Sequence, residues 1–243
     1  MLNYSLYEIG KKFIIPLDKD GVPQIYQLRR LAVALTMVGG FIDAYTFEQR
    51  GGSLAAMQTG NIIFLSVDVA KRNLPSFMTK VAAILFFSLG VLAVSLFKHR
   101  HNTHYWRIPT LLLEMMVCII IGFEPRSVSN IFAVPPLAMV MAMQTTAFNA
   151  IEGHGYNSVY STGNLKMTMI AIGEFHFHHN RSQLISALLY LELVVAFAAG
   201  AIISALLQLS FNVHAIWFAA VGILLIIVGY SVALHQKNIH FSD

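Results

Sequence analysis

Residues 57–61, Met57-Gln58-Thr59-Gly60-Asn61, place a polar tripeptide inside an apolar run, and Ser161-Thr162-Gly163-Asn164 does the same in a second run. The two tripeptides are 103 positions apart. Glycine lowers helix propensity, and asparagine competes for backbone hydrogen bonds. Each run is therefore predicted either to cross a membrane with a kink or to break at its Gly-Asn step.

Apolar runs around these stretches divide the chain into eight segments of 16 to 24 residues. About 20 residues of helix span a bilayer. The runs are continuous rather than alternating, and a backbone in lipid must satisfy its own hydrogen bonds, so helices are favoured over strands. We predict an all-α integral membrane protein, a helical bundle of about eight hydrophobic segments with six to eight spans. The segments are 31–47, 54–70, 78–97, 108–123, 131–150, 156–173, 184–207 and 213–234.

The composition also favours a membrane protein. Hydrophobic residues make up 56% of the chain and charged residues 12%, whereas a soluble domain carries about 25% charged residues. A lipid bilayer is therefore the expected partner of the outer surface. The net charge of +4 comes from basic residues at the ends of apolar runs, which is typical of the positive-inside rule and not of nucleic-acid binding. The single cysteine, Cys118, is interpreted as a packed thiol, and neither a metal nor a cofactor is predicted.

An offset of 103 residues pairs the first four segments with the last four, in order. This predicts two related four-segment repeats, which are common in membrane transporters. Eight spans would make the repeats parallel, and six spans would make them inverted. We favour eight, because the connecting loops then stay short, and both arrangements place the N- and C-termini in the cytoplasm. The predicted parts are a cytoplasmic N-terminal segment at 1–30, a first membrane repeat at 31–123, a second at 131–234 and a cytoplasmic C-terminal tail at 235–243.

Two motifs carry a family resemblance. Gly39-Gly40-Phe41-Ile42-Asp43-Ala44-Tyr45 followed by 57–61, with Met143-Gln144 before 161–164 in the second half, resembles the signature of the YoaK family. That family, also called DUF1275 or UPF0700, consists of bacterial multi-pass membrane proteins. The resemblance covers about residues 30–234, and it implies the membrane class directly and transport only by analogy. The chain departs from the pattern after Gln144, where the family often has an asparagine soon afterwards, and Asn149 is the candidate to compensate.

Polar side chains inside the apolar segments form the candidate substrate site. Broken helices with exposed half-helix ends bind substrate in many transporters, and an asparagine amide can both donate and accept. Close helix packing, in which glycine permits backbone approach and threonine and asparagine bond across the interface, stays open as the alternative. The candidate substrate-binding residues are Asp43, Gln58, Thr59, Asn61, Gln144, Asn149, Thr162 and Asn164.

Carboxylates inside the segments are candidates for proton coupling. An ionised carboxylate near mid-bilayer costs about 2.5–3.5 kcal/mol on insertion scales, so it is usually paired, protonated or exposed to a water-filled cavity. For Asp68 a surface ion pair with Lys71 or Arg72 is the favoured interpretation, and helix packing stays open for the glutamates. The proton-coupling candidates are Asp43, Asp68, Glu114 and Glu192.

The chain lacks the G-x-S-x-G, H-E-x-x-H, P-loop and G-x-G-x-x-G signatures of enzymes. Two histidine clusters, at 99–104 and 176–179, fit no zinc motif and are interpreted as solvated loop ends. We predict a transporter or permease for a small polar or amphiphilic molecule in the bacterial plasma membrane, with no enzymatic activity. The alternatives are a non-transporting membrane assembly or sensor protein and an intramembrane enzyme acting on lipid, and a homo-oligomer stays open.

Overall fold

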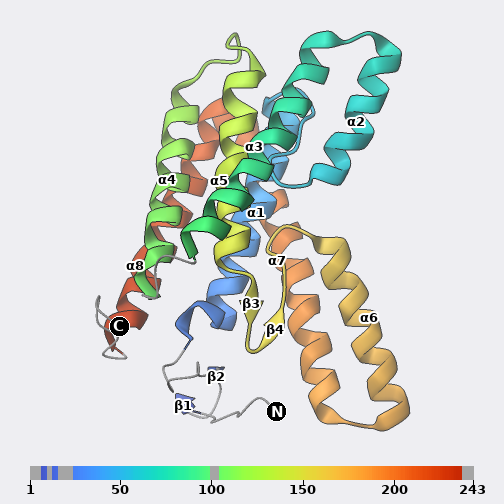
Figure 1. Cartoon of the computed structure of the whole chain (residues 1–243), viewed down its shortest axis with the longest axis vertical. Coiled ribbons are helices and arrows are strands. Elements are labelled where there is room, and N and C mark those ends of the chain that lie inside the picture. The colour runs from blue at the N-terminus through green and yellow to red at the C-terminus, as the bar shows by residue number, and fades with distance from the viewer. Residues whose placement is uncertain (1–6, 10–12, 16–23, 99–103, 237–243) are drawn as a thin grey trace.

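The computed structural model describes residues 7–9, 13–15, 24–98 and 104–236, and helices account for most of them (Figure 1). This confirms the prediction of an all-α bundle. Two short antiparallel strand pairs are β1 (Tyr7–Ile9) with β2 (Phe13–Ile15) and β3 (Ala150–Ile151) with β4 (His154–Gly155). The α-helices are α1 (Arg29–Gln49), α2 (Gln58–Lys71), α3 (Leu74–Lys98), α4 (Arg107–Phe123), α5 (Asn130–Ala147), α6 (Ser161–His178), α7 (Arg181–Phe211) and α8 (Ile216–Gln236). Short 3₁₀ turns precede α1, α4 and α8 at Ile25–Gln27, His104–Trp106 and Asn212–Ala215.

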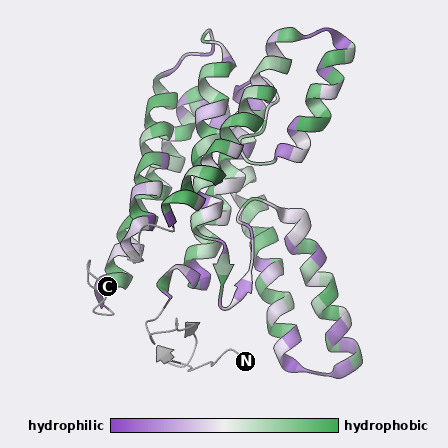
Figure 2. Ribbon diagram, viewed as in Figure 1, coloured by the Kyte–Doolittle hydropathy of each residue, from purple (hydrophilic) through white to green (hydrophobic). Residues whose placement is uncertain are grey.

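Several helices have the length and composition of membrane spans. Arg29–Gln49, Leu74–Lys98 and the continuous stretch Arg181–Gln236 are long and apolar enough to cross a bilayer. Hydrophobic residues cover most of the height of the bundle, and hydrophilic residues gather at the turns at its two ends (Figure 2). Large side chains such as Leu206 and Leu225 are 61% and 67% exposed. A surface of this kind is stable in lipid and not in water, so the chain is a membrane protein.

Helices α2 and α6 reach only from mid-height to one end of the bundle (Figure 1). After α1 the chain turns back to mid-height before α2 begins, and after β4 it does the same before α6 begins. The 14 residues of α2 rise about 21 Å, less than the roughly 30 Å hydrocarbon core. This length fits the six-span alternative, in which α2 and α6 are re-entrant half-helices, better than the eight spans preferred from the sequence. Residues 54–57 and 156–160, which the sequence analysis placed at the start of helical segments, are loops.

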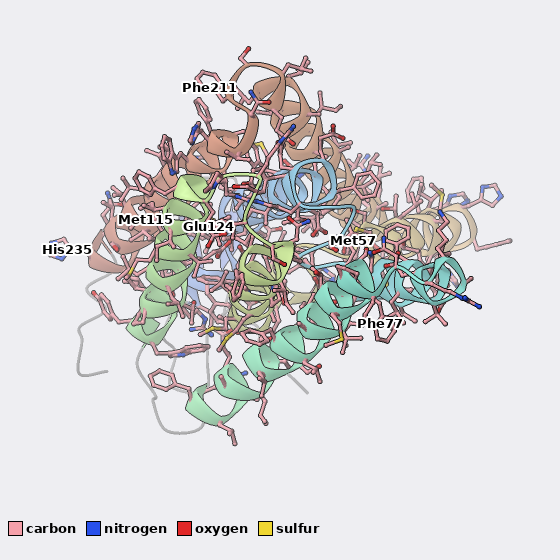
Figure 3. The ribbon with its side chains drawn as sticks, turned by 90° about the horizontal axis from the view of Figure 1, so that it is seen from above. Met57, Phe77, Met115, Glu124, Phe211 and His235 are labelled. Atoms are coloured by element: carbon pink, nitrogen blue, oxygen red, sulfur yellow. The ribbon has the colours of Figure 1, made fainter. Side chains whose placement is uncertain are left out.

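The two half-helices run in opposite directions. Helix α2 runs from mid-height to the end of the bundle where α1 finishes, whereas α6 runs to the end where α1 begins (Figure 1). Helices α1 and α5 are likewise antiparallel, and α1 begins at the same end at which α8 finishes. Seen from above, α2 and α6 project to the edge of the bundle opposite α4 and α8, with Met57 at the start of α2 and Met115 and His235 on the far side (Figure 3).

Glycines allow two helix pairs to pack at backbone contact. Helix α1 packs along α7, and α5 packs along α3. A Cβ atom at Gly200 of α7 would lie 1.9 Å from the Met37 carbonyl oxygen of α1, and a Cβ at Gly90 of α3 would lie 2.4 Å from the Met139 oxygen of α5. Small residues at such crossings bring helix backbones together, which is a main source of helix association in membranes.

Two buried arginines close the ends of the bundle. Arg50, with no exposed surface, donates to the carbonyl oxygens of Ile121 (3.0 Å), Glu124 (2.8 Å) and Pro125 (3.4 Å), which lie at the C-terminal end of α4. At the opposite end Arg107 donates to the Ala147 oxygen of α5 at 2.8 Å. Both arginines satisfy helix-terminal carbonyls that would otherwise be unpaired.

We expect Gly200→Ala to destabilise the protein. The new methyl group has no space against the Met37 backbone, and overpacking of this kind costs about 1–3 kcal/mol. The melting temperature in detergent should fall relative to wild type. Gly229→Ala in α8 is the matched control, because nothing lies within 4 Å of its Cβ position, and its melting temperature should not fall. Equal melting temperatures for the two variants would contradict the close α1–α7 crossing.

Candidate functional site

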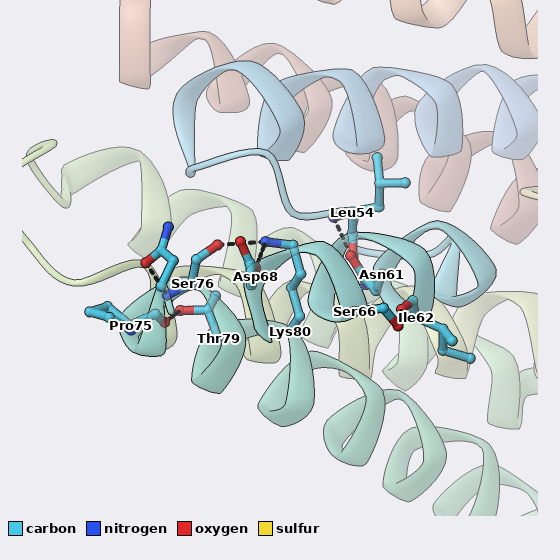
Figure 4. A network of polar contacts seen from close by, with 10 residues as sticks. Leu54, Asn61, Ile62, Ser66, Asp68, Pro75, Ser76, Thr79 and Lys80 are labelled. Carbon is cyan, nitrogen blue, oxygen red and sulfur yellow. Dashed lines mark hydrogen bonds and ion pairs between the residues drawn. The ribbon is translucent and has the colours of Figure 1, made fainter. Parts of the chain in front are cut away.

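The first re-entrant loop is residues 50–57, between α1 and α2. Asn61 holds this loop against the start of α2. Its Oδ1 accepts from the Leu54 amide at 2.9 Å, and its Nδ2 donates to the Leu54 carbonyl at 2.6 Å (Figure 4). The same Nδ2 donates to Gln58 Oε1 at 2.8 Å, and Gln58 Nε2 donates to the Ala55 oxygen at 2.8 Å. The Thr-Gly-Asn tripeptide therefore forms the first turn of a helix and does not interrupt one. Its asparagine satisfies loop backbone groups that would otherwise be unpaired at membrane depth.

Asn164 has the corresponding role in the second re-entrant loop, residues 156–160 between β4 and α6. Its Nδ2 donates to the Asn157 carbonyl at 3.1 Å, across the same separation of seven residues that joins Asn61 to Leu54. Both asparagines are buried, with 0% and 4% of their surface exposed. Their amides thus position the loops, and a solute would meet the loops and not these amides directly.

Asp43 lies where the first loop returns to α1. The residue is 3% exposed, and its Oδ1 accepts from the Ala56 amide at 2.8 Å. One turn later Thr46 Oγ1 accepts from the Ala55 amide at 3.2 Å. Among the described residues Asp43 Oδ2 has no hydrogen-bond partner, and such a group is costly unless it binds a proton, an ion or water.

The second loop packs against the same stretch of α1. A Cβ at Gly39, one turn before Asp43, would lie 2.8 Å from Val159 Cγ1 and 3.2 Å from the Ser158 oxygen. Tyr160, at the end of this loop, is partly buried against the hydrophobic core to which Phe41 and Ile42 of α1 belong. The two re-entrant loops therefore meet on the 39–43 stretch of α1, and Asp43 is the carboxylate at their junction.

A second buried carboxylate supports the second loop. Glu114 of α4 has no exposed surface. The Gln144 amide of α5 lies between Glu114 and Ser158, and with its nitrogen toward Glu114 it donates to both carboxylate oxygens at 2.7 and 2.9 Å and accepts from Ser158 Oγ at 3.2 Å. Glu114, Gln144 and Ser158 thus form a polar chain from α4 through α5 to the loop.

Asp68 belongs to a separate ion pair. Lys80 Nζ of α3 lies 2.8 Å from Asp68 Oδ2 and 2.6 Å from Ser76 Oγ (Figure 4). The exposed fractions of the two side chains are 3% for Lys80 and 11% for Asp68. The favoured interpretation, a surface pair with Lys71 or Arg72, is therefore wrong, and the pair instead fastens half-helix α2 to α3.

Four predicted residues lie away from the junction of the loops. Thr59 and Thr162 are exposed on the outer faces of α2 and α6. Asn149 is exposed after the end of α5, where its carbonyl accepts from the Tyr156 amide at 3.2 Å. Glu192 pairs with Arg29, and its side chain is 40% exposed, so it is not an interior carboxylate.

The first turns of α2 and α6 give the junction its electrostatic character. Both half-helices begin near mid-height (Figure 1). A helix N-terminus carries about half a positive elementary charge and unpaired N–H groups. In transporters with broken helices such ends face the polar groups of substrates. Both first turns therefore place partial positive charge next to the loops that precede them.

Comparison with known proteins identifies the family. Residues 31–229 match the family described as "Protein of unknown function (DUF1275)". The chain belongs to the DUF1275 family. It is 24% identical over 191 residues to the UPF0700 transmembrane protein YoaK of Bacillus subtilis (strain 168), covering 75% of this chain and 85% of that protein. No solved structure gives a significant match.

Sequence reasoning missed part of the junction in this DUF1275 protein. Ser158 and Val159 contact α1 or α5, but they stand in the stretch 156–173 that the sequence predicts to be a membrane segment. The repeat offset offered a signal, because Ser158 and Ala55 are 103 positions apart and each lies three residues before its half-helix. Among the described residues no group of three or more His, Cys, Asp or Glu side chains could hold a metal, and His99 and His101 lie outside the described residues.

We expect the Asp68–Lys80 pair of the DUF1275 chain to show strong coupling in a double-mutant cycle. Lys80→Met leaves a largely buried carboxylate without its partner, which costs about 3 kcal/mol. The double variant with Asp68→Asn should recover much of the lost melting temperature, because neither charge remains. Additive losses from the two single variants would show that the pair does not join α2 to α3.

Proposed function

We propose that this protein is a permease for a small polar or amphiphilic molecule, with its central site where the two re-entrant loops meet on α1. In this proposal Asp43 contacts the solute or its coupling proton. Asn61 and Gln58 hold the first loop, and Asn164 and Gln144 hold the second. Glu114 supports the second loop through Gln144. The protein acts as a carrier or channel and not as an enzyme.

The proposal includes two inverted repeats, α1–α4 and α5–α8. Three features support them: the antiparallel course of α1 and α5, the half-helices at the second place of each set, and the paired crossings of α1 with α7 and α5 with α3. At each crossing a glycine lies against the backbone of a methionine, Gly200 against Met37 and Gly90 against Met139. Inverted repeats with discontinuous helices are a common plan of secondary transporters, whose binding sites lie near the bilayer midplane.

One observation carries the proposal. A buried carboxylate with an unpartnered oxygen, Asp43, lies beside two loops of irregular backbone from which the half-helices begin. Irregular backbone at membrane depth is tolerated where it is buried in protein or lines a water-filled cavity, and ionisable groups there are functional by default. A protein with a purely structural role has no need of this costly combination.

We further propose a plasma-membrane location with both termini in the cytoplasm. Helix α1 begins and α8 finishes at one end of the bundle. The sequence before α1 contains Lys11, Lys12 and Lys19, which favours that end as cytoplasmic under the positive-inside rule. Arg50 and Arg107 do not contribute to this comparison, because both are buried among carbonyl groups.

A second candidate is a membrane assembly or sensor protein that does not transport. It is favoured by the outer faces of α2 and α6, which lie along one edge of the bundle (Figure 3). Ile62 and Ile63 of α2 and Leu165 and Met169 of α6 are between 44% and 58% exposed. A second copy of the chain or another membrane protein would bury this edge.

A flux measurement tests the permease. The protein is reconstituted into liposomes, and the uptake of a panel of neutral, anionic and zwitterionic solutes is followed with and without a pH gradient. Asp43→Asn keeps an oxygen that can accept from the Ala56 amide but removes the ionisable group. We expect it to lower flux at least about tenfold, equivalent to about 1.4 kcal/mol on the barrier, with little change in melting temperature.

Asn149→Ala is the matched control for this measurement, because it removes a predicted site residue that lies away from the junction. Its flux should equal that of wild type. Wild-type flux in Asp43→Asn would overturn the site. Absence of flux for the whole panel, together with stoichiometric purification with another membrane protein, would favour the assembly candidate.

A further inference from the structure

A polar cavity lies at the end of the bundle where α1 and α4 finish. Its volume is about 420 Å³, within the range of small-molecule sites. It is walled by the loops that join α1 to α2, α2 to α3 and α4 to α5, together with the first turns of α3. Its polar lining residues include Ser53, Asn73, Ser76, Thr79, Arg126 and Asn130.

The cavity offers hydrogen-bond donors and one cation. No aspartate or glutamate is among its lining residues. The nearby Asp68 pairs with Lys80, whose amine also binds the lining residue Ser76. Glu124, whose Oε2 has no hydrogen-bond partner among the described residues, is not among the lining residues. The interior is therefore complementary to a negatively charged or oxygen-rich ligand.

Arg126 is held in place for such a role. Its Nε donates to Gln49 Oε1 at 2.9 Å, and one terminal nitrogen, Nη2, donates to the same oxygen. Within the described part of the chain the other terminal nitrogen, Nη1, has no hydrogen-bond partner, and Arg126 lines the cavity. A guanidinium fixed by a neighbouring side chain loses less entropy when it binds a carboxylate or phosphate.

Ser53 supplies an independent indication of a ligand. The residue is 1% exposed and lines the cavity, and among the described residues its Oγ has no hydrogen-bond partner. A buried hydroxyl without a partner costs free energy. A ligand oxygen in the cavity would satisfy it.

We propose that this cavity is a binding site for a small oxyanion, a carboxylate or phosphate compound, held by Arg126 and Ser53. The site is separate from the junction at Asp43 and does not depend on the permease proposal. Ser53 nevertheless belongs to the first re-entrant loop, three residues before the Ala56 amide that Asp43 binds. A ligand on Ser53 would therefore contact the same loop that forms one wall of the junction.

Calorimetric titration of the full-length protein in mild detergent tests the site. The probes are succinate and inorganic phosphate, with glucose as the neutral comparison, all at constant ionic strength. We expect wild type to bind at least one anion and not glucose. Arg126→Gln should weaken anion binding about tenfold or more, because a charge-assisted hydrogen bond is lost, and Ser53→Ala should weaken it less.

Lys71→Gln is the matched control, because it removes one positive charge near the same end without touching the cavity lining. Its affinity should stay within about twofold of wild type. Asp43→Asn should also bind the anion as wild type does, which separates this site from the permease site. Melting temperatures of all variants identify any that fail to fold, and Arg126→Lys then supplies the test, with partial binding expected.

Three results would overturn the proposal. The first is an affinity in Arg126→Gln equal to that of wild type. The second is an equal loss in Lys71→Gln and Arg126→Gln, which would mean a general surface-charge effect. The third is absence of binding of both anions to wild type. None of these results bears on flux through the Asp43 junction.

Discussion

The hydrogen bonding of irregular backbone at membrane depth is the constraint on which the rest of this structure depends. Two loops, 50–57 and 156–160, run as irregular backbone toward the middle of the bundle, and lipid cannot satisfy the peptide groups that they bury there. Each loop is closed by an asparagine from the first turn of the half-helix that follows it. Asp43 and Thr46 of α1 accept from two further amides of the first loop, and Gln144 of α5 bonds the Ser158 side chain of the second loop.

This constraint explains why the interior of such an apolar protein contains so many polar side chains. Asp43, Asn61, Gln144 and Asn164 are at least nine-tenths buried, and each contacts a loop. The helices that present them must be fixed closely enough to keep these distances near 3 Å. The glycine crossings of α1 with α7 and of α3 with α5 provide that rigidity, since they bring the helix backbones into direct contact.

The helical membrane class followed from the sequence, because the length and continuity of the apolar runs leave no other backbone solution in lipid. The number of membrane spans could not be predicted from the sequence in the same way. Residues 54–57 are all apolar, and hydropathy does not distinguish a re-entrant loop buried in protein from the first turn of a spanning helix. The direction of the half-helices depends on how α1 and α5 pack, and these contacts join residues far apart in the chain.

Part of the candidate site could also be predicted from the sequence. The motif residues Asp43, Gln58, Asn61, Gln144 and Asn164 lie at the loops, because their polarity inside apolar runs has a physical cost that only a partner offsets. Thr59 and Thr162 belong to the same motifs, but the helical period turns them outward. Glu192 and Asp68 also stand inside apolar runs, yet each has a basic partner on another helix, Arg29 or Lys80, which no local pattern reveals.

The buried position of Arg50 has a consequence for how the protein enters the membrane during synthesis. Its carbonyl partners begin at Ile121, 71 residues later in the chain. At about 5–20 residues per second, several seconds pass between the synthesis of the arginine and that of its partners. During this interval the charge has to remain in the translocation channel, at the interface or with water. The stretch from α1 to the end of α4 is therefore one unit of insertion, completed only when its last helix arrives.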